Sequence, residues 1–389
     1  MKSYRVAVCG TAYGQVYLSA FLKRSPEFRL AGIIGRGSGR SRVYAREFGV
    51  PFYSSVDELP DNIDIACVVV RSTIAGGEGT FLAKEFLRRG IHVIQEHPVH
   101  EGDILSCLKL AEENKAVYHV NGHYVNVDPV TTFIEYLERA REKQRPLFIE
   151  ATAAPQTLYS LMDIIGRAVG GFLPYAFSDP IVWGEELKEM ASCSVLPFKC
   201  LQGVIKGIPV TLKIQDYIDP RAFDNHFLIM HRISVGTESG NVTLVNTHGP
   251  VVWSQSFSIE ERRGSAEAQP SFRRRSTAFF GYDYPTAVSF TGECAPSLCE
   301  IAVRKWPEAV IKALLALRRQ IETGIAPPGQ SREYLSGLSG AWLELTKKAG
   351  PALQMDICTA PPSFPDPVMF KSSIFQQPGK SGKAKENGL

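Results

Sequence analysis

Short apolar runs alternate with amphipathic segments through the first 125 residues of the chain. The apolar runs are residues 4–9, 29–34, 63–70, 91–95 and 116–121. Between them, segments near 14–24, 41–48, 77–89 and 101–115 carry apolar residues at helical spacing. Strands that alternate with helices in this way form a parallel sheet with helices on both faces. The pattern therefore predicts an α/β fold whose first domain, residues 1–125, is doubly wound.

The pattern changes after about residue 145, where strands follow one another directly. A strand at 147–154 and a helix at 158–169 precede strands at 209–218, 227–237, 241–247 and 250–257. Consecutive strands pair antiparallel, so residues 126–359 are predicted to form an α+β domain with a mostly antiparallel sheet. Helical patterns at 308–323 and 332–349 could pack on either domain. Residues 360–389 are rich in Pro, Gly, Ser and Lys, and we expect a disordered tail there.

Composition and charge exclude several classes of protein. The 389 residues include 43 Lys and Arg against 40 Asp and Glu, and a net charge of +3 gives no field that would attract nucleic acid or a membrane surface. The most apolar run, residues 63–70, is far shorter than the roughly 18 residues that cross a bilayer. The N-terminus lacks a secretory signal pattern, so we expect a cytoplasmic protein. The eight cysteines and eight histidines show no metal-ligand spacing, and no metal is predicted.

A glycine-rich turn directly follows the first strand. Gly10 permits a tight turn, and the small residues Ala12 and Gly14 let the backbone approach a pyrophosphate, as in a Rossmann domain. The turn departs from G-x-G-x-x-G, because Ala12 replaces the second glycine and Gly14 stands one place early. Its place after a strand still favours a dinucleotide site over an ordinary turn. The predicted contacts are Gly10, Thr11, Ala12, Tyr13 and Gly14.

The end of the second strand carries arginines where an NAD-binding domain usually has an acid. Arg36, Arg40 and Arg42 lie there, together with the hydroxyls of Ser38 and Ser41. Guanidinium groups and hydroxyls bind phosphate through hydrogen bonds that the charges strengthen. The segment therefore favours NADP, with its 2′-phosphate, over NAD. A solvated basic turn before a helix is the alternative.

Further polar segments end strands at the same edge of the predicted sheet, where ligands of open α/β folds bind. The candidate cofactor contacts there are Arg71, Ser72, Thr73, Glu96 and His97. The first three could equally cap the helix that follows. Tyr124 comes after the last strand of this domain, and we expect the preceding His123 to be a cap or to face solvent.

The glycine turn, a strand-end Glu-x-Pro and a following antiparallel domain resemble the glucose-fructose oxidoreductase / inositol dehydrogenase superfamily. His97 stands where that superfamily has its catalytic lysine. A second mark of the superfamily is a helix with His three residues before Asp. Here that segment is Ser160-Leu161-Met162-Asp163, so Asp163 matches and the histidine is absent. Both groups that move the proton of a substrate hydroxyl in its sugar and polyol dehydrogenases are therefore missing.

Residues 10–124 instead closely resemble the stand-alone thiazolinyl imine reductases of siderophore biosynthesis, including the segments 65–73 and 93–98. The similarity continues in residues 303–309 and 336–342. The resemblance implies an oxidoreductase that uses NADPH to reduce a thiazoline C=N to a thiazolidine. It also implies that the substrate is a thioester on a carrier domain of a nonribosomal peptide synthetase, in a pathway of the pyochelin or yersiniabactin type.

Reduction of a C=N bond needs a hydride at carbon and a proton at nitrogen, so the site must offer an acid. Histidine titrates near neutral pH, and a tyrosine can relay a proton that a neighbour resupplies. His97 and Tyr124 are both plausible donors, and the resemblance singles out the same two positions. We predict that Tyr124 is the immediate donor, that His97 orients or recharges it, and that Glu96 positions them. Asp163 is either a substrate ligand or a buried hydrogen-bonding residue.

Two other functions stay open. A sugar or polyol dehydrogenase of the same superfamily would keep the fold, and a non-catalytic NADP-binding regulator would keep only the cofactor site. The resemblance implies two kinds of partner: the carrier domain that bears the substrate, and a second copy of the chain in a homodimer or higher homo-oligomer. A basic loop at 262–275 could meet an acidic carrier domain or simply face solvent.

Overall fold

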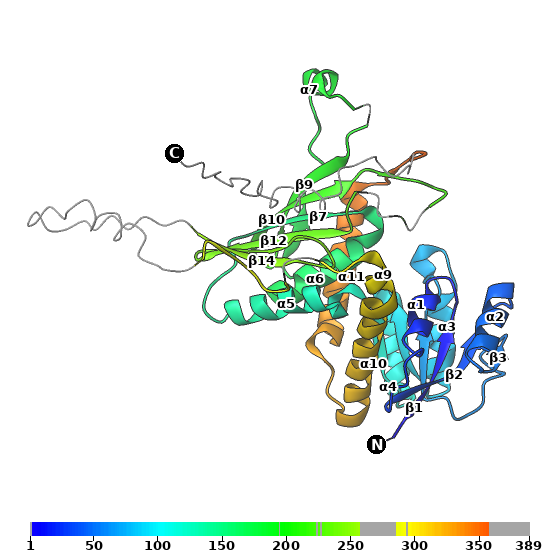
Figure 1. The fold of residues 1–389 in the computed structure, drawn as a ribbon. Coiled ribbons are helices and arrows are strands. Elements are labelled where there is room, and N and C mark those ends of the chain that lie inside the picture. Colours follow the sequence, from blue (N-terminus) through cyan, green and yellow to red (C-terminus); the bar gives the residue numbers. More distant parts are fainter. Residues whose placement is uncertain are drawn as a thin grey trace, which may run out of the picture.

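Two sheets, each with its own helices, make up the computed structural model of the chain (Figure 1). The structure describes residues 2–193, 195–222, 225, 228–256, 285–292 and 295–357. The predicted tail at 360–389 and the basic loop at 262–275 lie outside the described residues. The predicted fold class, a doubly wound Rossmann domain followed by an α+β domain with a mostly antiparallel sheet, is confirmed.

The first sheet has six parallel strands in the order β3-β2-β1-β4-β5-β6. The strands are β1 (Tyr4–Cys9), β2 (Phe28–Ile34), β3 (Phe52–Tyr53), β4 (Ile65–Val68), β5 (His92–Glu96) and β6 (Tyr118–Asn121). The helices are α1 (Gly14–Ser19), α2 (Gly39–Glu47), α3 (Gly79–Arg88) and α4 (Glu101–Glu113), with a 3₁₀ turn η1 (Thr73–Ala75). The strand order reverses between β1 and β4, and open α/β sheets bind ligands outside the carboxyl ends of their strands at such a point.

The second sheet has eight strands in the order β15-β14-β13-β12-β7-β10-β9-β8. They are β7 (Phe148–Ala153), β8 (Tyr175–Phe177), β9 (Phe198–Ile205), β10 (Ile208–Gln215), β12 (His231–Thr237), β13 (Gly240–Leu244), β14 (Val251–Gln255) and β15 (Ala287–Ser289). Neighbouring strands pair antiparallel, except that β7 and β10 are parallel. Strand β10 alternates buried and exposed residues, as expected where one face packs on helices and the other is open.

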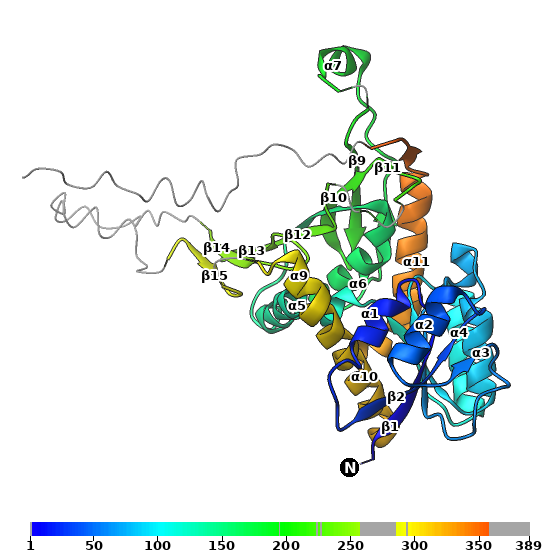
Figure 2. The same ribbon diagram turned by 45° about the vertical axis from the view of Figure 1, so that its right-hand side comes forward.

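Helices cover the apolar face of this second sheet. α5 (Asp128–Ala140) and α6 (Leu158–Val169) share one core with the buried residues of its strands. α11 (Arg332–Ala349) packs against α6 and α4, and so joins the two domains (Figure 2). The remaining elements are η2 (Tyr124–Asn126), η3 (Pro155–Thr157), α7 (Glu185–Met190), β11 (Tyr217–Ile218), α9 (Leu298–Glu300), η4 (Ile301–Lys305), α10 (Trp306–Thr323), η5 (Pro328–Gln330) and β16 (Leu353–Gln354).

Several elements were not predicted, among them α5, β3, β8 and β9. α5 has a clear signal, since Pro129 starts it and the apolar residues at 130, 133, 134 and 137 follow at helical spacing. β3 and β8 have only two and three residues, too few for a pattern. β9 is mostly half-buried, without the alternation that marks a strand. These three strands are therefore recognised only through their pairing partners.

Helix α10 returns to cover the Rossmann sheet, although it lies far beyond residue 125 in the chain. Val310, Leu314 and Leu317 are buried in one cluster with Val6 and Val8 of β1. A boundary at residue 125 thus separates the two sheets but not their cores.

The position of α10 predicts that its buried residues stabilise the first domain. Val310→Ala removes two fully buried carbon atoms, and we expect the free energy of unfolding to fall by about 2 kcal/mol. The measurement is urea denaturation followed separately by NADPH binding and by circular dichroism. Leu315→Ala, at a position 40 % exposed on the same helix, is the control and should change little. Equal effects of both substitutions would contradict the assignment of α10 to this core.

Candidate active site at the carboxyl edge of the Rossmann sheet

The glycine turn after β1 brings the backbone close to the end of β4. Gly10 has a φ of +96°, and a Cβ there would overlap the carbonyl oxygen of Val69. Only glycine fits such a position. Thr11 is buried and Ala12 is exposed, whereas a Cβ on Gly14 would meet ordinary contacts. This tight turn beside the end of β4 fits the close approach of a dinucleotide there.

The basic turn after β2 forms the start of α2. The side chain of Ser38 caps this nine-residue helix by accepting from the Ser41 backbone N–H at 3.3 Å. The Ser41 hydroxyl lies 2.8 Å from that of Ser38 and 2.9 Å from that of Thr11, and Ser41 is buried. Ser41 therefore ties the two turns together from beneath. Arg36 and Arg40 are exposed beside them.

Arg42 has a different role from its two neighbours. Its guanidinium lies over the ring of Phe52, 5.1 Å from the ring centroid, and its Nε donates to the Gly37 carbonyl at 3.4 Å. It therefore supports the turn, while Arg36, Arg40 and the Ser38 hydroxyl form its outer surface. This combination of a helix N-terminus and guanidinium groups fits a phosphate.

The polar residues after β4 also include one that supports the structure and others that are exposed. Ser72 is buried, and its hydroxyl donates to the carbonyl of Pro98, so it links this segment to the end of β5. Arg71 and Thr73 are exposed, and Thr73 begins the turn η1. Of the three predicted contacts, these two have side chains that a ligand at the edge can reach.

Glu96 is the last residue of β5 and lies at the carboxyl edge of the Rossmann sheet. One carboxylate oxygen accepts from the Tyr17 hydroxyl, and the other lies 3.2 Å from Nδ1 of His97. His97 Nδ1 also lies 3.0 Å from the backbone carbonyl of Asn121. Because a carbonyl only accepts, Nδ1 carries hydrogen, and Nε2 is left as the nitrogen that exchanges a proton.

The surroundings of His97 favour its charged form. Burial alone would lower the pKa of the imidazole, but the hydrogen bond and negative charge of Glu96 outweigh it, with smaller contributions from the Asn121 carbonyl and Asp163. The pKa of His97 is therefore raised above 6.5. A histidine whose protonated form is favoured, and which has one nitrogen free of these partners, can act as a general acid.

Asp163 lies behind His97 on α6 and is 2 % exposed. Its Oδ1 accepts from Arg167 Nε at 2.8 Å and from the Tyr334 hydroxyl at 2.8 Å. A Cβ on Gly122 would overlap Oδ2, so the carboxylate also packs against the end of β6. These contacts are those of a buried ion pair. They favour the role of a buried hydrogen-bonding residue for Asp163 over that of a substrate ligand.

His123 overturns an expectation, because it is fully buried instead of capping a helix or facing solvent. Its φ of +44°, with a 2.5 Å bond from the Tyr124 N–H to the Gly122 carbonyl, makes a γ-turn, a rare and strained conformation. Neither ring nitrogen has a hydrogen-bond partner among the described residues, and burial lowers the pKa of His123 to about 4. A neutral imidazole with unmet hydrogen-bonding capacity thus lies next to Tyr124.

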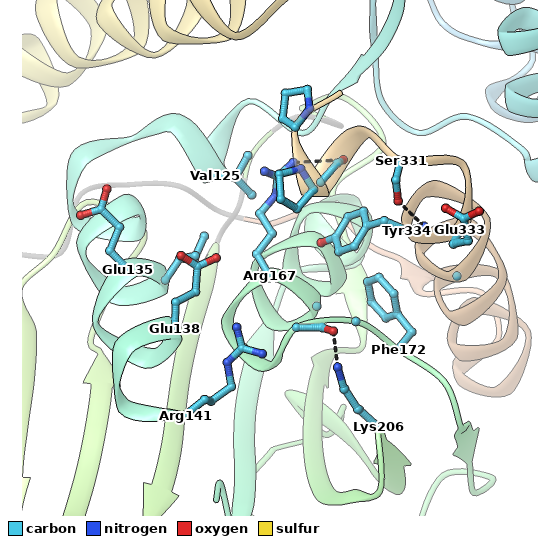
Figure 3. A pocket seen from close by; sticks show the side chains of 18 of the residues that line it. Val125, Glu135, Glu138, Arg141, Arg167, Phe172, Lys206, Ser331, Glu333 and Tyr334 are labelled. Atoms are coloured by element: carbon cyan, nitrogen blue, oxygen red, sulfur yellow. Dashed lines mark hydrogen bonds between the residues drawn. The ribbon is translucent and has the colours of Figure 1, made fainter. Parts of the chain in front are cut away.

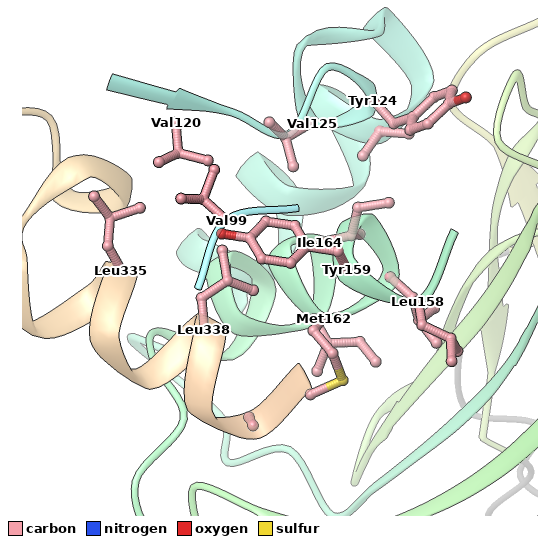
Figure 4. Packing of buried hydrophobic residues seen from close by; sticks show 14 of the residues in the cluster. Val99, Val120, Tyr124, Val125, Leu158, Tyr159, Met162, Ile164, Leu335 and Leu338 are labelled. Carbon is pink, nitrogen blue, oxygen red and sulfur yellow. The ribbon is translucent and has the colours of Figure 1, made fainter. Parts of the chain in front are cut away.

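Tyr124 lies at the margin of the apolar core, with its hydroxyl directed away from the cluster (Figure 4). Its ring packs edge-on against His123 and His231, with centroids 5.2 Å apart in both cases. Tyr13, from the glycine turn, lies edge-on to His123, and the nearby Tyr124 contributes to raising the pKa of Tyr13 after burial. Tyr124 and the cofactor turn are thus neighbours, as the sequence predicted from strand ends alone.

Three residues of the site were missed by sequence reasoning. Tyr17 is on α1, one turn after Gly14, and the helical period could have placed it near the edge. Tyr159 stacks on His97, with centroids 5.3 Å apart, and His231 is held by the hydroxyls of Ser160 and Thr247. Nothing near Tyr159 or His231 in the sequence indicates these contacts.

Within the ranges that the structure describes, no helix is long and apolar enough to cross a bilayer. The same residues contain no group of three or more His, Cys, Asp or Glu side chains that could hold a metal ion.

Two family models match the chain. Residues 4–122 match an oxidoreductase family with an NAD-binding Rossmann fold, and residues 144–254 match the C-terminal domain of thiazolinyl imine reductase Irp3-like proteins. The first domain is therefore similar to this oxidoreductase family, and the second domain is similar to the Irp3-like C-terminal domain. A comparison with curated protein sequences gives no match.

The chain shares its fold with solved dehydrogenases. UDP-N-acetylglucosamine 3-dehydrogenase GnnA from Acidithiobacillus ferrooxidans is 14% identical, with a TM-score of 0.59 over 88% of this chain and 96% of that chain. An oxidoreductase from Agrobacterium radiobacter in complex with NAD⁺, L-tartaric acid and magnesium is 11% identical, with a TM-score of 0.61 over 88% and 95%. Levoglucosan dehydrogenase, in complex with NADH and levoglucosan, is 14% identical, with a TM-score of 0.60 over 90% and 98%. At these identities the likeness shows the fold alone.

Proposed function

We propose that this Irp3-like oxidoreductase uses NADPH to reduce the C=N bond of a thiazoline to a thiazolidine. The observation that carries the proposal is the Glu96–His97 pair at the carboxyl edge of the Rossmann sheet, in which Glu96 favours the protonated form of His97. The second domain of the same chain matches thiazolinyl imine reductase Irp3-like proteins. His97 replaces the lysine expected of a sugar dehydrogenase of this superfamily. A protonated imidazole suits a reaction in which a substrate nitrogen gains a proton.

Hydride transfer to the imine carbon is the chemistry that a bound reduced nicotinamide supplies. The residues of the chain supply the proton. As the C=N π bond breaks, a new N–H bond forms with the proton held at Nε2 of His97, which becomes neutral and regains a proton from solvent. Glu96 and the Asn121 carbonyl keep Nδ1 protonated throughout, so the same nitrogen is offered in each turnover.

Tyr124 is the second acid, and the proton can reach the substrate nitrogen by two routes. In the first route, Tyr124 donates its proton to the substrate nitrogen and is reprotonated by His97. In the second, His97 donates its proton to the nitrogen directly. The ring of Tyr124 packs against His123, which also contacts Tyr13 of the glycine turn, and this proximity to the cofactor turn supports contact with bound substrate. In both orders of transfer the proton originates at His97, because the hydrogen bond and charge of Glu96 outweigh burial, raise the pKa of the imidazole and so favour its protonated form.

The test is loss of NADPH absorbance with purified protein and an aryl-thiazoline thioester, run beside NADH and beside sugars and polyols with NADP⁺. Thiazoline turnover that prefers NADPH would support the proposal. Oxidation of a polyol without thiazoline turnover would overturn it in favour of a sugar or polyol dehydrogenase. Cofactor binding without any turnover would favour an NADP-dependent regulator.

Preference for NADPH is predicted to depend on the outer surface of the basic turn. Removing Arg36 and Arg40 together should raise the KM for NADPH by about 10–100-fold, because a charge-assisted hydrogen bond contributes about 1.5–3 kcal/mol. The KM for NADH should stay unchanged, since it lacks the 2′-phosphate. Arg46→Ala, an exposed arginine in the last turn of α2, is the matched control. Equal loss with both cofactors would contradict a 2′-phosphate site here.

We further propose that the substrate arrives as a thioester on a nonribosomal peptide synthetase carrier domain in a siderophore pathway, and that the protein works as a homodimer or higher homo-oligomer. Delivery by a carrier domain is what the resemblance to thiazolinyl imine reductases implies, and the match of residues 144–254 to the Irp3-like C-terminal domain supports that resemblance. A carrier-bound thiazoline should then have a higher kcat/KM than the same thioester free in solution. Sedimentation equilibrium of the full chain measures its oligomeric state.

A further inference from the structure

A cavity of about 740 Å³ lies between α5, α6 and α11, away from the glycine turn and the basic turn (Figure 3). Its inner wall includes Arg141, Arg167, Phe172 and Tyr334, and the β9–β10 hairpin adds Lys206. This volume falls in the range of cavities that hold small molecules. None of the residues predicted to bind the cofactor lines it.

The inner wall carries a guanidinium without a counter-charge. The guanidinium of Arg141, just after α5, makes no hydrogen bond or ion pair with a described residue, and its Nε is buried. It packs against Gly170 so closely that a Cβ there would overlap it. Lys206 reaches the same place and donates to the Gly170 carbonyl. Two cations therefore meet at the end of α6, and neither forms an ion pair with a described residue.

An arginine keeps its charge in any protein environment, so burying part of it without a partner costs free energy. The carbonyls at the end of α6 offset only part of this cost, because the Gly170 carbonyl is already engaged by Lys206. An anion between Arg141 and Lys206 would satisfy both. A carboxylate matches the planar donor set of the guanidinium.

The remaining lining limits the ligand further. Phe172 is buried and Tyr334 is half-buried, so they offer apolar and aromatic surface next to the cations. Glu135, Glu138 and Glu333 are exposed lining residues, and their charges would repel a ligand that carries several negative charges. The ligand that fits this lining is a compact apolar molecule with one carboxylate.

We propose that the cavity between α5, α6 and α11 is a second ligand site, which binds a small apolar monocarboxylate through Arg141 and Lys206. The proposal does not rest on the reaction assigned to the active site. The two sites share a wall, since Arg167 lines the cavity and also holds Asp163 behind His97. Ligand binding in the cavity can therefore affect the active site through Arg167 and Asp163, without contact between the two ligands.

The test is calorimetric titration of the full chain, saturated with NADP⁺, with benzoate as the probe. Benzoate should bind at one site, and the neutral isostere benzamide should bind at least about tenfold more weakly, because the charged hydrogen bonds are lost. Arg141→Met should weaken benzoate by a similar factor. Lys206→Met, on the exposed hairpin, gives the same test if the first variant fails to fold.

Two controls separate this site from the others. Arg139→Met, an exposed arginine on the same helix, should leave benzoate binding unchanged, as should Arg46→Ala, an exposed arginine on α2. Benzoate binding that survives both Arg141→Met and Lys206→Met, or that benzamide equals, would overturn the proposal. Tighter binding of inorganic phosphate than of benzoate would also overturn it, because the site would then be a phosphate site.

Discussion

Replacing His97 by alanine is expected to lower kcat for thiazoline reduction by about 10²–10⁴-fold, the usual contribution of a positioned general acid. The imidazole is the group whose pKa is raised by Glu96, so its loss removes the proton source in either order of transfer. Steady-state kinetics measures the effect, and NADPH binding followed by fluorescence shows that the cofactor site is intact. Tyr124→Phe separates the orders: a loss as large as that of His97→Ala means that Tyr124 is the immediate donor. A His97→Ala enzyme with the wild-type kcat would remove His97 from the mechanism.

The pH profile gives a second measure of the same group. The protonated form of His97 is the active one, so kcat should fall as the pH rises through the raised pKa of His97. Glu96→Gln removes the charge that raises this pKa and leaves the burial that lowers it. The fall should therefore move to lower pH by about one to three units. Tyr17→Phe keeps the carboxylate and removes only one of its hydrogen bonds, so the fall should not move to lower pH in this control. An unmoved profile in Glu96→Gln would contradict the role of the pair.

Arg167→Leu is expected to lower the free energy of unfolding by about 3–5 kcal/mol, because it leaves the buried Asp163 carboxylate without its counter-charge. Asp163 is 2 % exposed, and no other cation is hydrogen-bonded to it among the described residues. Urea denaturation measures the loss. The Tyr334 hydroxyl still donates to the carboxylate in this variant, but a neutral donor does not balance the charge.

The double variant Asp163→Asn with Arg167→Leu is the matched control for this pair. Replacing both charges by neutral groups removes the uncompensated carboxylate, so the double variant should be more stable than Arg167→Leu alone. Tyr334→Phe removes one hydrogen bond to the carboxylate and should cost less than Arg167→Leu. A double variant that is less stable than Arg167→Leu would show that Asp163 contributes through other contacts.

Much of the first domain could be predicted from local pattern. Parallel strands buried on both faces are continuous apolar runs, and all five predicted runs contain strands of the sheet. The carboxyl ends of parallel strands share one edge, so residues at those ends, such as Glu96 and Tyr124, could be brought together before any contact was known. Helix α5 also had its signal in the sequence, and only the very short or half-buried strands lacked one.

The contacts of the site could not be predicted in the same way. Tyr17 bonds to Glu96 across 79 positions of the chain, and Tyr334 bonds to Asp163 across 171. No local period relates such residues. The burial of His123 depends on Tyr13 and Trp306, which pack around it from the two ends of the chain. Its hydrophilic side chain and its place after a strand end both favoured exposure, and tertiary packing overrode them.

The sequence by itself determined the alternation of long strands and helices in the first domain, the glycine turn with the arginines after it, and the presence of Glu96 and His97 at a strand end. Each of these depends on residues that are neighbours along the chain, and local backbone chemistry decides them. Only the tertiary structure decided that Asp163 pairs with Arg167, that α10 belongs to the first core, and that Arg141 and Lys206 meet at one cavity. These features depend on which distant surfaces exclude water together, and that is a property of the packed molecule.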